Sequence, residues 1–168
     1  GPVDMLILGS SHAYRGFDPR IFAKHGIRIF NLGSTNQTPL QMEVLLNRHL
    51  AQLRPYAVVI EVLPASLSSD GLESTLDLLA NGRVDEAITA LALGTHHLKA
   101  VNAVVHAWMK QIISGPPSTT ETARKELDEY ISGGYVQQDA ITPIKDPPDV
   151  IAAQPLREEQ LAALRRCI

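Results

Sequence analysis

Two serines and a histidine follow an apolar run near the start of the chain, in the segment LILGSSHA (6–13). A serine hydroxyl held at the end of a strand can attack a carbonyl carbon when a neighbouring base removes its proton. The alternative is ordinary turn chemistry, because serines that follow a glycine often cap the backbone after them. The choice between a catalytic serine and a capping serine depends on which other residues lie near it in the fold.

A second polar loop, Asn31–Asn36, follows the next apolar run, and a third segment, Leu63–Ser66, follows the run after that. If the runs are parallel strands of one sheet, the three segments share its carboxyl edge, where open α/β sheets bind ligands. Glycines in the first two loops permit a close approach to the backbone. Backbone N–H groups from both loops could then stabilise a developing oxyanion.

The elements that must position these loops have the pattern of an α/β fold. Three apolar runs show little alternation, as expected of buried parallel strands, and they cover residues 4–8, 27–32 and 56–63. Helices are predicted between them from their caps and apolar periodicity, at 18–26 and 38–53. The expected core is therefore a βαβαβ unit.

The rest of the chain is predicted to be mainly helical. A helical stripe that we interpret as core consists of Val101, Val104, Val105, Trp108, Met109 and Ile112. A capping box at Ser118–Glu121 predicts a charged helix that runs to about Ile131. The predicted organisation is a tag remnant and leader (1–3) and one domain (4–168), made of the core (4–64), a helical insertion (70–132), an extended loop (133–155) and a helix (156–168).

The third strand would lie at an edge of this small sheet, although it is the most apolar of the three. Long apolar edges promote association. We infer that the chain, which opens with Gly1-Pro2 as cleaved tags do, is a fragment of a larger α/β domain or that a partner covers the edge. Self-association through this strand is one such arrangement.

Three segments together resemble the SGNH, or GDSL-like, hydrolase superfamily: LILGSSHAYRGFDP, IRIFNLGSTNQTP and AVVIEVLP. The nearer likeness is to its bacterial envelope branch of O-acetyltransferase-like domains, where Gly-Ser-Ser often replaces Gly-Asp-Ser. The resemblance covers about residues 4–64. It implies a three-layer flavodoxin-like parallel sheet, incomplete at its C-terminus here, with a helical insertion. It also implies Ser11 as the nucleophile, with the Gly33 and Ser11 N–H groups in the oxyanion hole, whereas Ser10 is interpreted as structural.

The chain departs from the family in two motifs. The third family motif supplies an asparagine, but this chain has Glu61-Val62-Leu63-Pro64 there, so we assign Asn36 as a stand-in. The last motif is Asp-x-x-His, and none of the six histidines has an aspartate three residues before it. The triad is therefore incomplete in this sequence, and we expect its base and acid beyond Ile168.

Several polar residues have both a functional and a structural interpretation. The side chains of Ser11 and His12 should diverge, so His12 is assigned to substrate binding, together with Arg15. Glu61 is either a perturbed carboxylate or a partner of Arg28 on the neighbouring strand, and we favour the ion pair. His49 is expected to pack at the edge of the core. The pair His96-His97 lacks the spacing of a metal site, and no metal or cofactor is expected.

Composition limits the function classes. A net charge of −3 gives no broad electrostatic case for nucleic acid or an anionic membrane, and a single cysteine excludes an internal disulfide. The leading hypothesis is a serine esterase or O-acetyltransferase that acts on an acylated carbohydrate or cell-envelope polymer. The resemblance implies a periplasmic or other extracytoplasmic location and allows a membrane anchor in the parent protein. The alternative is a non-catalytic SGNH-like module that binds a glycan or a protein.

Overall fold

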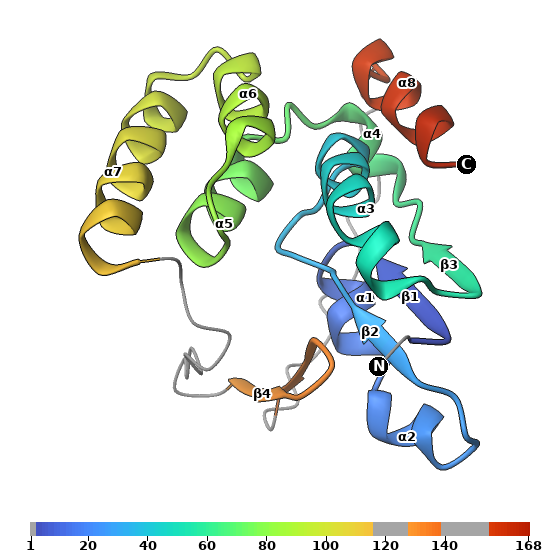
Figure 1. Ribbon diagram of the computed structural model, residues 1–168. Helices are drawn as coiled ribbons and strands as arrows, with labels where there is room; N and C mark the ends of the chain where they lie inside the picture. Colours follow the sequence, from blue (N-terminus) through green and yellow to red (C-terminus); the bar gives the residue numbers. More distant parts are fainter. Residues whose placement is uncertain (1–2, 116–127, 139–154) are drawn as a thin grey trace.

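Three short parallel strands form the centre of the fold (Figure 1). The computed structural model describes residues 3–115, 128–138 and 155–168. The strands are β1 (Met5–Leu8), β2 (Ile29–Asn31) and β3 (Ala57–Ile60), in the order β2-β1-β3. The predicted α/β class and parallel sheet are confirmed, and β3 lies at an edge of the sheet.

Helices supply most of the remaining described structure. They are α1 (Ser11–Gly16), α2 (Pro19–Ala23), α3 (Pro39–Leu53), α4 (Pro64–Ser68), α5 (Leu72–Asn81), α6 (Glu86–Gly94), α7 (Leu98–Ser114) and α8 (Glu158–Cys167). Two of them, α1 and α4, were not expected from the sequence. Helix α1 begins three residues after the end of β1, and α4 begins four residues after the end of β3, so the segments after these strands lead into helices.

The central strand β1 is buried because helices pack on both faces of the sheet. On one face, Leu6 and Leu8 contact Met42, Leu45 and Leu46 of α3. The helix α8 packs against α3 and α4 on this side. On the other face, Ile7 packs with Ala13 of α1, next to partly buried aromatic residues of the following segment, Phe17 and Phe22.

Helix α3 begins with the capping box expected at Thr38. The Thr38 N–H donates to Gln41 Oε1, and Pro39 occupies the first helical position, where the absence of an N–H costs nothing. The Gln41 amide then donates to the Gly71 carbonyl and to the Thr75 hydroxyl. One buried side chain thus starts α3 and fixes it to the beginning of α5.

Helices α5, α6 and α7 form a separate group beside α3, with a small core of their own (Figure 1). The expectation that the whole α7 stripe is core was wrong. Val104 is buried and Trp108 is half-buried, with its indole N–H donating to Thr89. Four other members of the stripe are exposed on the outer side of α7: Val101, Val105, Met109 and Ile112.

A β-hairpin replaces part of the helix and loop that were expected at 118–155. The strands β4 (Asp128–Ile131) and β5 (Tyr135–Gln138) pair antiparallel, and the rest of the two predicted segments lies outside the described residues. The carbonyl of Gly133 in the hairpin turn accepts the Asn31 N–H of β2. The hairpin therefore meets the outer edge of β2, and among the described residues no strand pairs with the outer edge of β3. Within the described ranges, none of the helices has the length and apolarity needed to cross a bilayer.

Candidate functional site

The buried residue Ser10 joins the carboxyl ends of β1 and β3. Its N–H donates to Glu61 Oε2 over 2.7 Å, and its hydroxyl lies 2.9 and 3.0 Å from the two Glu61 oxygens. Ser10 is also the N-cap of α1, so the Glu61 carboxylate lies beside a helix start, where negative charge is favourable. Gly9 makes room for it, because a Cβ at Gly9 would lie 2.5 Å from Glu61 Oε2.

The His12 ring completes this cluster of Ser10, His12 and Glu61. Its Nδ1 lies 3.0 Å from the Ser10 hydroxyl and 3.3 Å from Glu61 Oε1. Because the Ser10 hydroxyl donates to Glu61, we assign the Nδ1 proton to His12, which leaves Nε2 as the acceptor. The His12 side chain is 72% exposed, so this nitrogen is accessible to a ligand.

The ion pair favoured for Glu61 was wrong. Arg28 instead bonds Asp4, with an Nη2–Oδ1 distance of 3.0 Å, and this hydrogen bond lowers the pKa of Asp4. The physical reason is register. Glu61 lies beyond the carboxyl end of β3, whereas Arg28 precedes β2 at the opposite end of the sheet, next to the start of β1.

Ser11, the predicted nucleophile, is the first residue of α1 and is partly exposed. It follows the N-cap Ser10, so it lies beyond the carboxyl end of the central strand. His12 turns its Nδ1 toward Ser10 and Glu61. Ser10 is therefore held by hydrogen bonds within the cluster, and Ser11 is the next residue along the chain.

The loop after β2 is joined to the loop after β1 by side-chain amides. Gly33 donates its N–H to Asn31 Oδ1 over 2.9 Å, and the Asn31 amide donates to the Ala13 carbonyl. The Gly33 N–H assigned to the oxyanion hole is thus engaged in this structure. To face an oxyanion, it would have to exchange that bond.

Gln37 is the residue of this site that the sequence did not reveal. Its side chain is fully buried, its Oε1 accepts the Gly9 N–H, and its Nε2 donates to Leu32 O and Ser34 Oγ. The only signal in the sequence was a glutamine just before the Thr38 cap. Gln37 can make these hydrogen bonds only because of the conformation of the loop after β2, which the amino-acid composition does not specify.

Asn36 and Arg15 lie at the margin of the site. Asn36 is exposed, adopts a left-handed backbone conformation with φ of 47°, and donates its amide to Glu73 of α5 over 2.5 Å. The structure therefore shows Asn36 joining two elements. Arg15 is in the last turn of α1, with its guanidinium carbon 5.5 Å from the centre of the Tyr14 ring.

His49 and His97 lie outside this cluster, and His97 begins a helix, although the pair His96-His97 was expected to end one. His49 is half-buried on α3, and burial lowers its pKa. His97 is the N-cap of α7 and lies 3.0 Å from Asp70. Within the described residues, no group of three or more His, Cys, Asp or Glu side chains could hold a metal ion.

Comparisons with known proteins give no independent evidence on the function of this site. No family model matches the chain, and neither the curated proteins nor the solved structures contain a significant match.

Proposed function

We propose that the protein is a serine esterase or O-acyltransferase of the SGNH type that acts on an acylated carbohydrate or cell-envelope polymer. The observation that carries the proposal is the position of Ser11. It begins α1 at the carboxyl end of the central strand of a β2-β1-β3 parallel sheet, beside the anchored Ser10. This strand order and the polar loops at the same edge agree with a flavodoxin-like arrangement.

In the proposed reaction, Ser11 Oγ attacks the acyl carbonyl carbon as a base takes its proton. The ester C–O bond breaks, and the leaving alcohol takes a proton in turn. Water or a sugar hydroxyl then attacks the acyl-enzyme, which releases the acid or transfers the acyl group and restores the Ser11 hydroxyl. The backbone N–H of Ser11 is the proposed oxyanion donor, joined by Gly33 or Asn36 when they exchange their present partners.

The test is ester turnover by the protein at its natural full length. Ser11→Ala should reduce turnover of a small acetyl ester at least a hundredfold, and the circular dichroism spectrum should stay unchanged. The matched control is Ser69→Ala, which removes a hydroxyl outside the site. Turnover by Ser11→Ala equal to that of the control would remove Ser11 from the mechanism.

The second candidate function is a non-catalytic module that binds a glycan or a protein. It is favoured by the engagement of Gly33 by Asn31 and of Asn36 by Glu73, which occupies two groups expected in an oxyanion hole. Glycan-array binding that persists in Ser11→Ala, without ester turnover by the unmodified protein, would support this function over catalysis.

A further inference from the structure

The outer side of α7 carries an apolar stripe that nothing in the proposed reaction uses. Its six side chains are between 37% and 79% exposed, and they are Leu98, Val101, Val105, Met109, Ile112 and Ile113. Spacings of three and four residues place them on one side of the helix, over roughly a third of its circumference at 3.6 residues per turn. The opposite side, with Ala100, Val104 and Ala107, is buried against α5 and α6.

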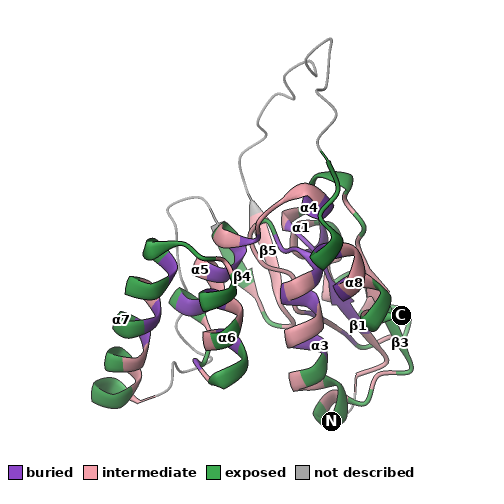
Figure 2. Cartoon of the chain, turned by 90° about the horizontal axis from the view of Figure 1, so that it is seen from above, coloured by how far each residue is buried: buried purple, intermediate pink, exposed green. Residues whose placement is uncertain are grey.

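The stripe extends along the whole helix and faces away from the rest of the molecule. Figure 2 shows the exposed side of α7 turned outward and the buried side turned toward α5 and α6. A helix of 17 residues is about 25 Å long at 1.5 Å per residue. The exposed apolar side chains of α7 therefore form a continuous narrow strip. This differs from the isolated apolar residues that most protein surfaces expose.

The charged side chains of α7 itself are both lysines, although Asp70 lies 3.0 Å from His97 at the N-cap of the helix. Lys99 and Lys110 are exposed on one flank of the stripe, with His106 between them. There is no aspartate or glutamate from residue 87 to residue 115, although the chain as a whole has 18 acidic residues and a net charge of −3. The segment 87–115 thus carries basic charge only, and its two lysines favour contact of α7 with a negative surface.

We propose that α7 docks on the surface of an anionic lipid bilayer. The helix would lie in the plane of the interface, with the apolar stripe below the headgroups and the lysine ammonium groups among the lipid phosphates. A second copy fits the stripe less well. An antiparallel pair of α7 helices would place Lys99 of one copy next to Lys110 of the other.

The experiment is co-sedimentation of the protein with vesicles of phosphatidylcholine and phosphatidylglycerol in a 3:1 ratio. Val105→Asp and Met109→Asp should each reduce the bound fraction at least fivefold. The matched control is Ile21→Asp, because Ile21 is an equally exposed apolar side chain on α2. All three positions are exposed, and thermal unfolding identifies any variant that fails to fold.

The electrostatic part of the proposal has its own variant. The double reversal Lys99→Glu with Lys110→Glu should weaken binding and remove the preference over pure phosphatidylcholine vesicles. Binding by the unmodified protein should also fall with added salt, which screens exposed charges.

Three results would overturn the proposal. The first is no sedimentation with vesicles, or equal sedimentation of Val105→Asp and Ile21→Asp. The second is dimerisation without lipid that Val105→Asp abolishes, which would assign the stripe to a second copy. The third is stripe-dependent binding of a synthetic amphipathic peptide of glutamate and leucine heptads without binding to vesicles, which would assign it to a protein.

Discussion

At the scale of single residues, the two adjacent serines have different environments for a reason that lies outside their own segment. Glu61, which follows the last residue of β3 and lies 51 positions further along the chain, accepts hydrogen bonds from both the N–H and the hydroxyl of Ser10. A carboxylate that accepts several hydrogen bonds holds its donors firmly. The sequence motif placed both serines at the strand end, but only the contact with Glu61 tells which of them is anchored.

Replacing Glu61 tests this anchor. Glu61→Gln leaves one oxygen for the Ser10 N–H, the Ser10 hydroxyl and His12, and it places an NH₂ group against a donor. We expect a loss of about 1.5–3 kcal/mol in the free energy of unfolding, as for hydrogen bonds to a charged group. Urea denaturation measures it, with the exposed Glu86→Gln as control. An equal effect of both variants would contradict the structural role of Glu61.

Gln37 gives a second residue-scale prediction. Gln37→Leu leaves the Gly9 N–H, the Leu32 carbonyl and the Ser34 hydroxyl without their partner. Each buried group left without a hydrogen bond costs about 1–3 kcal/mol, so the loss of stability should exceed about 2 kcal/mol. The control is Gln52→Leu, at an exposed position on α3. Its free energy of unfolding, measured by chemical denaturation, should differ from that of the unmodified protein by less than about 0.5 kcal/mol. A loss for Gln37→Leu as small as for Gln52→Leu would show that the two loops do not depend on this amide.

At the scale of elements, apolar runs and caps predicted the core well and the segments between its strands less well. The βαβαβ unit follows from the apolar runs, from Pro19 at the start of α2 and from the capping box at Thr38. The helices α1 and α4 were missed because each has only five or six residues and no apolar periodicity of its own. The hairpin was missed because its strands are held by pairing with each other, which local propensity does not encode.

The open edge of β3 leads to a prediction of self-association. Tyr56 and Val62 flank the strand and are 89% and 53% exposed, and Val58 within it is also exposed. We propose that two copies pair along this edge. The weight-average mass in sedimentation equilibrium should rise with concentration, and Val58→Lys should keep the protein monomeric. A monomer at every concentration would contradict this pairing.

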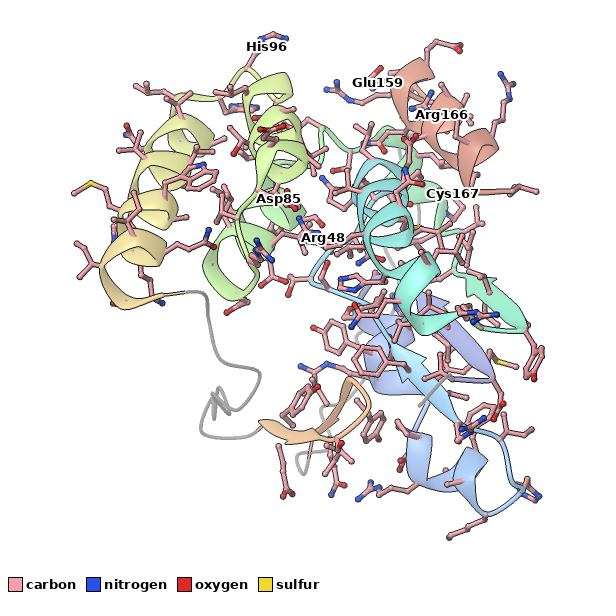
Figure 3. All side chains as sticks on the ribbon, viewed as in Figure 1. Arg48, Asp85, His96, Glu159, Arg166 and Cys167 are labelled. Carbon is pink, nitrogen blue, oxygen red and sulfur yellow. The ribbon has the colours of Figure 1, made fainter. Side chains whose placement is uncertain are left out.

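At the scale of the whole molecule, one ion pair connects the helical group to the sheet domain. Arg48 of α3 and Asp85 at the N-cap of α6 point toward each other (Figure 3), with an Nη2–Oδ2 distance of 2.5 Å. Burial alone would raise the pKa of Asp85. The hydrogen bond from the Ile88 N–H and the charge of Arg48 outweigh burial and lower it.

Asp85 should therefore stabilise the fold in a pH-dependent way. A lowered carboxyl pKa contributes stability above the unfolded value of 3.8, and this contribution is lost as the pH falls through the folded value. Asp85→Asn retains the capping ability but loses the charge. Its loss of stability relative to the unmodified protein should therefore be present at pH 7 and should shrink as the pH falls below 3.8. Urea denaturation at several pH values measures it. A deficit that is independent of pH would contradict the role of the charge.

The most direct test of the central claim is to map the adduct that a fluorophosphonate forms with the protein at its natural full length. The reagent phosphonylates an activated serine, and mass spectrometry of the peptides locates it. The account predicts a single adduct on Ser11 that disappears in Ser11→Ala and persists in Glu86→Gln. An adduct on Ser10, or unchanged labelling in Ser11→Ala, would contradict the assignment of Ser11 as the nucleophile.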